Sequence, residues 1–143
     1  MVIEIQGQSI VEGEARGLAL VTDEPLSFWG GYDFHTGEIT DRRHPLSGEN
    51  AAGRILVVPF SRGSSTTTAV LLEAIRAETA PAAIITTTVD SFFALASIVA
   101  DEMYSRRIPI VTVSNRDFSR INSGDTLILG ENGTIRIESI VAH

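Results

Sequence analysis

The chain has 143 residues, of which 43% are hydrophobic and 20% are charged, a composition typical of a globular domain rather than a disordered segment. Its 18 acidic residues exceed its 11 basic residues, all of them arginine, and the net charge of −7 argues against a nucleic-acid partner because phosphates would be repelled. With no cysteine, the chain offers no thiolate for an iron–sulfur cluster, for nucleophilic catalysis or for a disulfide.

No targeting, membrane or metal motif stands out in the sequence. Residues 1–4 do not begin a basic and then apolar export signal, and no window approaches the roughly 18 apolar residues of a membrane helix. His35, His44 and His143 are too widely spaced for a zinc motif. We therefore expect a soluble, cytoplasmic protein that folds as one domain over residues 1–143.

The N-terminal segments predict a β-hairpin. Residues 2–11 alternate between apolar and polar side chains, which is the pattern of a strand with one exposed face. Gly13 supplies a turn, and residues 15–22 have the pattern of an antiparallel return strand.

Residues 28–50 predict a long loop, because they show no sustained period of either kind. Loops longer than about a dozen residues are usually functional or disordered, and this one is too aromatic for a linker. We expect Trp29, Tyr32 and Phe34 to pack the loop or to face a partner, with a short strand at residues 38–40.

A first strand–helix unit follows the loop. Residues 54–59 are a continuous apolar run, which favours a strand buried on both faces. A turn over residues 60–68 then leads into a helix that runs to about Arg76. One stripe of this helix is predicted to be buried, and it contains Val70, Leu71, Ala74 and Ile75.

A second unit repeats this arrangement. Residues 82–87 predict a buried strand, and residues 91–105 predict a helix whose N-cap is Asp90. Residues 108–113 predict a further buried strand. Pro109 cannot donate to a β-ladder, so it places this strand at a sheet edge or marks the strand's first residues.

The C-terminal region predicts a hairpin, with residues 125–129 and 134–140 flanking a turn that contains Asn132 and Gly133. Hairpins at both ends with strand–helix units between them favour an α/β fold of three layers, β/β/α. A doubly wound fold agrees less well, because the terminal strands alternate as if one face were exposed to water.

The turn at residues 62–65, hereafter the 62–65 turn, is the segment best suited to chemistry. A turn that opens a helix presents unpaired amides and the positive end of the helix dipole, and Arg62 and Gly63 add a bidentate donor and a closely approachable backbone. Ser64 and Ser65 either cap the helix or face an anionic ligand. The chain has no lysine for a Walker A loop, and Thr66 replaces the second glycine of a nucleophile elbow.

Five segments, in order along the chain, resemble the small subunit of the aconitase X family. They are residues 30–37 (GGYDFHTG), 41–48 (DRRHPLSG), 59–65 (PFSRGSS), 70–76 (VLLEAIR) and 80–84 (APAAI). The resemblance implies a swivelling β/β/α domain, the counterpart of the fourth domain of aconitase. It also implies a hydro-lyase whose cysteine-containing large subunit holds an iron–sulfur cluster, while this chain binds no cofactor by itself.

The resemblance places Ser64 where the family has its catalytic serine, the base that removes a proton from the carbon beside the substrate carboxylate. Arg62, Gly63 and Ser65 would bind the substrate or steady the alkoxide, and the choice between Ser64 and Ser65 as the base stays open. The sequence departs from the family pattern where Ser61 replaces a glycine, at residues 66–67, and at residues 96–97.

Two substrate classes are known in the family, cis-3-hydroxy-L-proline and mevalonate 5-phosphate. The forms of residues 44–46, 64–65 and 70–76 resemble the hydroxyproline branch, so this hydroxy acid is the expected substrate and mevalonate 5-phosphate the alternative.

Other interpretations remain open from the residues alone. Asp33 could position substrate or form an Asx turn, and His44 could be an acid or base or a structural hydrogen-bonding residue. A phosphohistidine carrier of similar architecture would need a histidine in the 62–65 turn. A non-catalytic domain that binds a regulatory anion at this turn is the third possibility.

Overall fold

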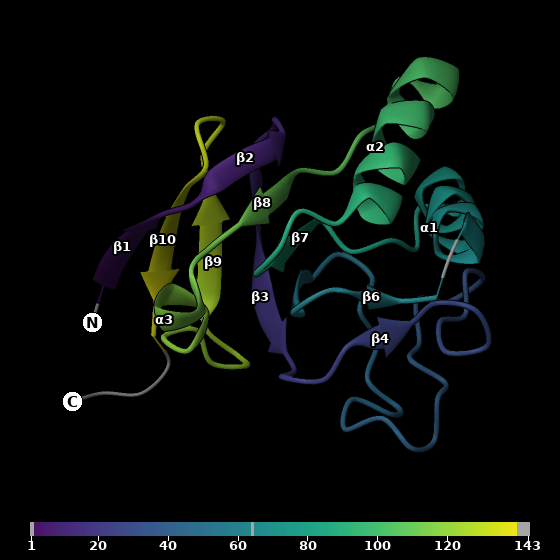
Figure 1. Cartoon of the computed structure of the whole chain (residues 1–143), viewed down its shortest axis with the longest axis horizontal. Helices are drawn as coiled ribbons and strands as arrows, with labels where there is room; N and C mark the ends of the chain where they lie inside the picture. The colour runs from purple at the N-terminus through teal and green to yellow at the C-terminus, as the bar shows by residue number, and fades with distance from the viewer. Residues whose placement is uncertain (1, 64, 140–143) are drawn as a thin grey trace.

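The computed structural model describes residues 2–63 and 65–139 (Figure 1). The helices are α1 (Ser65–Ala77), α2 (Ser91–Tyr104) and α3 (Asn115–Phe118). The strands are β1 (Val2–Gln6), β2 (Gln8–Val11), β3 (Ala15–Val21), β4 (Leu26–Ser27), β5 (Ile55–Val57), β6 (Ser61–Arg62), β7 (Ala83–Thr86), β8 (Ile110–Thr112), β9 (Thr126–Leu129) and β10 (Thr134–Glu138).

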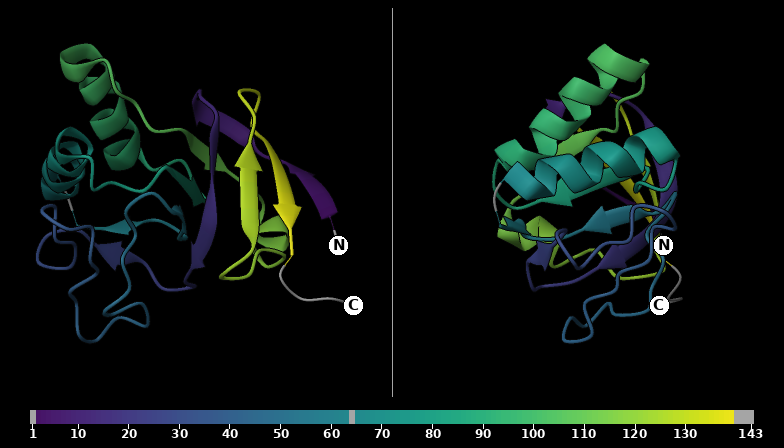
Figure 2. Two further views of the ribbon diagram at one scale, coloured as in Figure 1. Left: turned by 180° about the vertical axis from the view of Figure 1, so that it is seen from behind. Right: turned by 90° about the vertical axis from the view of Figure 1, so that its right-hand side faces the viewer.

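One large sheet, with strand order β1-β10-β9-β3-β5-β7-β8-β2 in the described residues, forms two of the layers. The β1, β10, β9 and β3 strands are antiparallel neighbours, whereas β3, β5, β7 and β8 run parallel and β2 pairs antiparallel with β8. The long strand β3 belongs to both halves, because its first residues pair with β9 and its last residues pair with β5. Figure 2 shows α1 and α2 on the side of the parallel strands that faces away from the antiparallel half.

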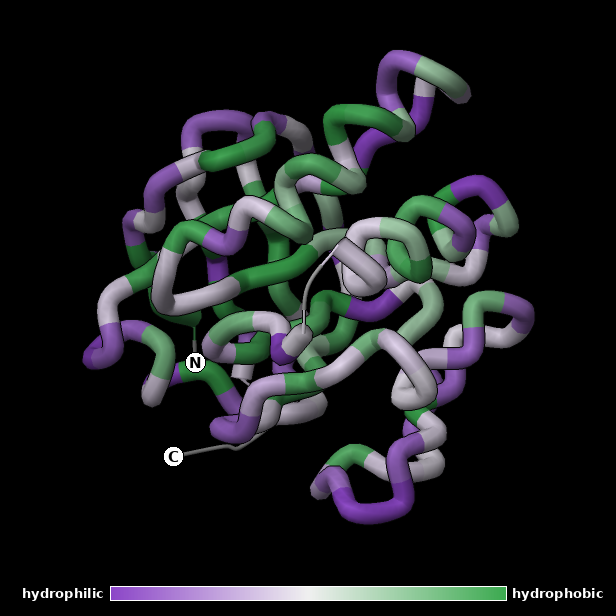
Figure 3. Tube along the Cα trace, turned by 45° about the vertical axis from the view of Figure 1, so that its right-hand side comes forward, coloured by the Kyte–Doolittle hydropathy of each residue, from purple (hydrophilic) through white to green (hydrophobic). Residues whose placement is uncertain are grey.

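The parallel strands are buried on both faces. Leu56, Ile84 and Ile110 face the helices and belong to the same core cluster as Leu71 and Phe93. Alternate residues of the same strands face the antiparallel half; they include Ile55, Val57, Ile85 and Val111, which pack with Leu127 and Ile135. Each such side chain contributes about 1.5–3 kcal/mol by leaving water. The apolar interior and the hydrophilic projecting loops are visible in Figure 3. The predicted three-layer β/β/α fold is therefore confirmed.

The two long helices begin and end close to their predicted limits. In α1, Val70, Leu71, Ala74 and Ile75 are buried as expected, together with Thr67. Asp90 is the N-cap of α2, and its Oδ1 accepts hydrogen bonds from the amides of Phe92 and Phe93, both at 3.1 Å. The two helices are joined where the Thr68 hydroxyl donates to the carbonyl of Phe92 at 3.0 Å.

The predicted N-terminal hairpin is wrong. β1 pairs with β10 and β2 pairs with β8, while the described residues show no pairing of either strand with β3. The chain passes from one half of the sheet to the other at Gly7, where a Cβ would lie 2.5 Å from Val111 Cγ1 and 2.7 Å from the Thr112 carbonyl. Alternation identified two strands correctly, but it contains no information about which distant strand each one pairs with.

The other strand predictions agree with the structure in most respects. The C-terminal hairpin is present over β9 and β10, although residue 140 lies outside the described residues. Pro109 immediately precedes β8, so it marks the strand's start, and β8 lies between β7 and β2 rather than at an edge. In place of the predicted strand at residues 38–40, Ile39 and Glu38 form isolated bridges with Tyr32 and Asn50.

The long loop is ordered and packed, as predicted. Phe28 and Tyr32 are buried and stacked with ring centroids 4.8 Å apart, and Phe28 meets Phe93 of α2 edge to face at 5.3 Å. The Tyr32 hydroxyl donates to the carbonyl of Thr79 at 2.7 Å. Trp29 differs from Phe28 and Tyr32, because 71% of it is exposed.

Burial raises the pKa of Tyr32 above its ordinary value of 10.0. The unfolded chain therefore loses this proton first as the pH rises, and the free energy of unfolding should fall above pH 10 by up to about 1.4 kcal/mol per pH unit from this group. We expect Tyr32→Phe to lower the free energy of unfolding by about 1 kcal/mol at pH 7 and to lessen this alkaline loss. Urea titrations between pH 7 and 11 test both effects, and equal alkaline slopes in the two proteins would contradict the assignment.

Candidate active site

The 62–65 turn lies beyond the carboxyl end of a buried strand. The chain leaves β5 at Val57 and forms the short strand β6, which pairs in parallel with β4 so that Leu26 is opposite Ser61 and Ser27 is opposite Arg62. The long helix α1 then begins at Ser65. The structure thus adds a two-stranded sheet between the predicted buried strand and the predicted helix.

Hydrogen bonds from two sides hold the described part of this turn. The amide and the hydroxyl of Ser61 both donate to Oδ2 of Asp90, at 2.6 and 2.7 Å. On the other side, the hydroxyl of buried Thr67 donates to the carbonyl of Arg62 at 3.4 Å. Gly63 has a φ of 116°, a conformation that side-chain-bearing residues rarely adopt. The backbone of the turn therefore requires glycine at this position.

Ser64, the residue predicted to act as the base, lies outside the described residues. Its neighbours Gly63 and Ser65 are both exposed, and Ser65 is the first residue of α1. The amides at the start of this 13-residue helix supply the positive electrostatic environment that the sequence predicted for an anion. No acidic residue occupies the first turn of α1 to compete with a ligand.

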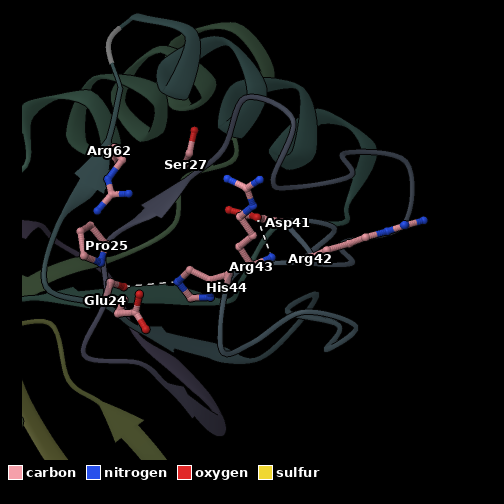
Figure 4. A pocket seen from close by; sticks show the side chains of 8 residues that line it. All are labelled: Glu24, Pro25, Ser27, Asp41, Arg42, Arg43, His44 and Arg62. Carbon is pink, nitrogen blue, oxygen red and sulfur yellow. Dashed lines mark hydrogen bonds between the residues drawn. The ribbon is translucent and has the colours of Figure 1, made fainter.

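A cleft of about 540 Å³ opens beside the turn, hereafter the arginine-lined cleft (Figure 4). Its lining residues come from the β3–β4 connection, from β4, from the long loop and from β6; they are Glu24, Pro25, Ser27, Asp41, Arg42, Arg43, His44 and Arg62. In Figure 4 the Arg62 side chain lies beside Pro25, whereas Arg42 extends away from the other side chains.

The charge of the cleft favours an anionic ligand. Three arginines and two carboxylates line it, and Arg62 forms no ion pair with any residue that the structure describes. An exposed guanidinium without a carboxylate partner has all its donors available for a carboxylate or phosphate.

His44 lines the cleft, but the contacts of its ring suit a structural role. The residue is 8% exposed, its Nδ1 accepts a hydrogen bond from the Leu46 amide at 3.1 Å, and its Nε2 lies 3.4 Å from the Glu24 carbonyl. With the proton on Nε2 both contacts are favourable, and the ring joins the long loop to the segment before β4.

Asp33 lies apart from the described residues that line the cleft. Its Oδ1 accepts a hydrogen bond from the His35 amide at 2.8 Å, and its carbonyl accepts from the amides of Thr36 and Gly37. These contacts are those of an Asx turn, the alternative considered for this residue.

Sequence reasoning missed two arginines of the cleft and one contact of the neighbouring turn. Arg42 and Arg43 belong to a segment that the resemblance singled out, yet no chemical motif marks them. Asp90 was predicted only as a helix cap, and nothing in the sequence signals its contact with Ser61.

Among the described residues, no group of three or more histidines, aspartates or glutamates could hold a metal ion, and no helix has the length and apolarity to cross a membrane.

Comparison with known proteins identifies the family of this chain. A protein-family model described as the aconitase X swivel domain matches residues 4–137. This chain belongs to the aconitase X swivel-domain family.

The swivel domain is similar to proteins of two functions. It is 45% identical over 109 residues to the cis-3-hydroxy-L-proline dehydratase of Pseudomonas aeruginosa, an alignment that covers 76% of this chain but only 19% of that enzyme. It is 40% identical over 98 residues to the phosphomevalonate dehydratase small subunit of Methanothermobacter thermautotrophicus, covering 68% of this chain and 75% of that subunit. The crystal structure of Thermococcus kodakaraensis aconitase X, in its holo form, matches with a TM-score of 0.85 and 31% identity over 96% of this chain and 99% of that one.

The requirement for glycine at residue 63, where φ is 116°, can be tested by substitution. We expect Gly63→Ala to lower the free energy of unfolding by about 1–3 kcal/mol through backbone strain. Crowding should contribute little, because a Cβ would meet nothing closer than the Thr67 hydroxyl at 3.5 Å. Urea titration measures the change, with exposed Thr66→Ala as the control that should stay within about 0.5 kcal/mol of wild type. Equal stabilities of the Gly63 variant and the wild type would show that the turn tolerates a side chain.

Proposed function

We propose that this chain is the small subunit of an aconitase X-type hydro-lyase, a dehydratase that is active only with a large subunit. The observation that carries the proposal is the position of Arg62, which is exposed, unpaired among the described residues and directed along the arginine-lined cleft at the start of a long helix. A hydroxy acid placed there would meet a guanidinium and helix amides together.

Ser64 is the base in this proposal. It takes the proton from the carbon beside the substrate carboxylate, the electron pair forms the new carbon–carbon double bond, and the hydroxyl group leaves the next carbon as hydroxide. The hydroxide and the proton that Ser64 has taken up together account for one water molecule, and release of that proton restores the alkoxide. A serine alkoxide forms at neutral pH only where opposite charge and hydrogen bonds favour the anion. The amides that open α1 and the guanidinium of Arg62 provide both.

The neighbouring residues bind the substrate. Arg62 pairs with the carboxylate, the glycine backbone at Gly63 allows close approach, and Ser65 donates a hydrogen bond from the first position of the helix. His44 and Asp33 are assigned structural roles, because both ring nitrogens of His44 and the Oδ1 of Asp33 already have backbone hydrogen-bond partners.

A large subunit has to complete the site. Arg62, Gly63 and Ser65 are all exposed on this chain, whereas alkoxide chemistry needs water to be excluded. The Methanothermobacter relative is named a small subunit, which supports the same division. This chain has no cysteine and does not fit a thiolate-held cluster, so we place the iron–sulfur cluster on the cysteine-containing large subunit.

cis-3-Hydroxy-L-proline is the substrate that we favour, on the strength of the 45% identity to an enzyme with that name. Mevalonate 5-phosphate is the second candidate. It is supported by the 40% identity to a separate small subunit and by the presence of Arg42 and Arg43 near Arg62, since a phosphate takes more donors than a carboxylate.

The two substrates are tested by combining this chain with its large subunit and supplying each in turn. We expect turnover of cis-3-hydroxy-L-proline. Turnover of mevalonate 5-phosphate alone would overturn the substrate assignment and keep the dehydratase. Anion binding without turnover of either compound would favour the non-catalytic interpretation.

Ser64→Ala should lower kcat in the two-chain complex by about 100-fold to 10,000-fold, the range that general bases contribute. Ser65→Ala is the matched control, and it should raise KM more than it lowers kcat. Size-exclusion chromatography checks that both variants still assemble. A wild-type kcat for Ser64→Ala together with a loss for Ser65→Ala would transfer the role of base to Ser65.

A further inference from the structure

Asp90 makes more contacts than a helix cap requires. The residue is 6% exposed, and its Oδ1 accepts from the amides of Phe92 and Phe93, which is sufficient to cap α2. Its Oδ2 accepts two further hydrogen bonds, from the amide and the hydroxyl of Ser61, a residue 29 positions earlier in the chain. One carboxylate thus joins the start of α2 to the residue before Arg62.

The two bonds to Ser61 are short. They measure 2.6 and 2.7 Å and involve a carboxylate, which makes them stronger than bonds between neutral groups. The opposing bond from Thr67 to the Arg62 carbonyl measures 3.4 Å, at the long end of the hydrogen-bond range. The strand pairing of β6 with β4 extends over only two residues. Among the described residues, Asp90 is therefore a strong restraint on where the Arg62 backbone lies.

We propose that Asp90 is a positioning residue for the dehydration: by holding Ser61 it fixes Arg62 and Gly63 relative to the arginine-lined cleft. The inference rests on the proposed function, because it concerns the same turn. Asp90 lines no part of that cleft, so its effect passes through Ser61 and not through contact with substrate. Misplacing a substrate-binding group by about 1 Å can lower a rate about 100-fold.

Two substitutions separate the two roles of Asp90, capping α2 and holding Ser61. Asp90→Asn keeps a carbonyl oxygen that can cap α2, while its amide nitrogen cannot accept a hydrogen bond from Ser61. Asp90→Ser keeps a good N-cap, and its shorter side chain has one oxygen in place of two. Both variants should retain α2 and lose the hydrogen bond that the Ser61 amide donates.

Ser97→Ala is the matched control. Ser97 lies on the same helix, is buried, and makes two hydrogen bonds, to the carbonyl of Ile108 at 2.7 Å and from its amide at 2.9 Å. Its loss should lower stability comparably and leave the 62–65 turn in place.

The first measurement is amide hydrogen exchange on the full 143-residue chain. In Asp90→Asn and Asp90→Ser the Ser61 amide should lose its protection while the Phe93 amide, within α2, keeps its own. In Ser97→Ala the Ser61 amide should stay protected. Unchanged protection of Ser61 in both Asp90 variants would overturn the proposal, whatever the activity of the complex.

The second measurement is steady-state kinetics of the two-chain complex. Both Asp90 variants should lower kcat about 100-fold and also raise KM, because Arg62 both steadies the alkoxide and pairs with the substrate carboxylate, whereas Ser97→Ala should keep the wild-type kcat and KM. Equal kcat values for the Asp90 variants and Ser97→Ala would overturn the positioning role. An inactive wild-type complex would instead contradict the proposed function, and it would leave the exchange result as a test of the contact alone.

Discussion

The structure depends on the burial of its parallel strands on both faces. Ile55 and Val57 face one layer and Leu56 faces the other, so β5 has no surface on which a polar group could meet water. Chemistry is therefore confined to the segments beyond the strand ends, as in other open α/β sheets where ligands bind beyond the carboxyl ends. The segments after β5 and β7 lie on the same edge, and this is why Ser61 and Asp90 meet despite their separation in sequence.

This arrangement also explains the division of the proposed enzyme between two chains. The swivel domain provides an arginine, a glycine backbone and the start of a helix on one open wall, and these groups suit anion binding and proton removal. The chain has no cysteine, so the groups that would hold an iron–sulfur cluster have to come from another polypeptide. In our account the two chains meet at the cleft, so that neither is active by itself.

The parts of the fold that could be predicted from sequence are those with local causes. The apolar run at residues 54–59 and the stripe on α1 follow from period and composition, and Asp90 was recognisable as a cap because Asp is favoured there. The N-terminal pairing could not be predicted, because β1 and β2 are separated by the close crossing at Gly7, which is a tertiary feature.

The residues of the candidate site, too, could be predicted only where their causes are local. Arg62 and Gly63 were evident from the turn and from the family resemblance. The arrival of His44 and Glu24 at the same cleft depends on how the long loop folds, and a loop without a period gives no indication of its path. The contact of Asp90 Oδ2 with Ser61 could not be predicted, because helix capping by itself accounts for an aspartate at this position.

The central claim is that an anionic hydroxy acid binds at Arg62 with its reacting carbon beside the serine that follows Gly63. A crystal structure of the two-chain complex with cis-3-hydroxy-L-proline bound tests this most directly. Our account predicts the substrate carboxylate within hydrogen-bond distance of the Arg62 guanidinium, inside the arginine-lined cleft. A substrate bound elsewhere, with Arg62 facing open solvent, would contradict it.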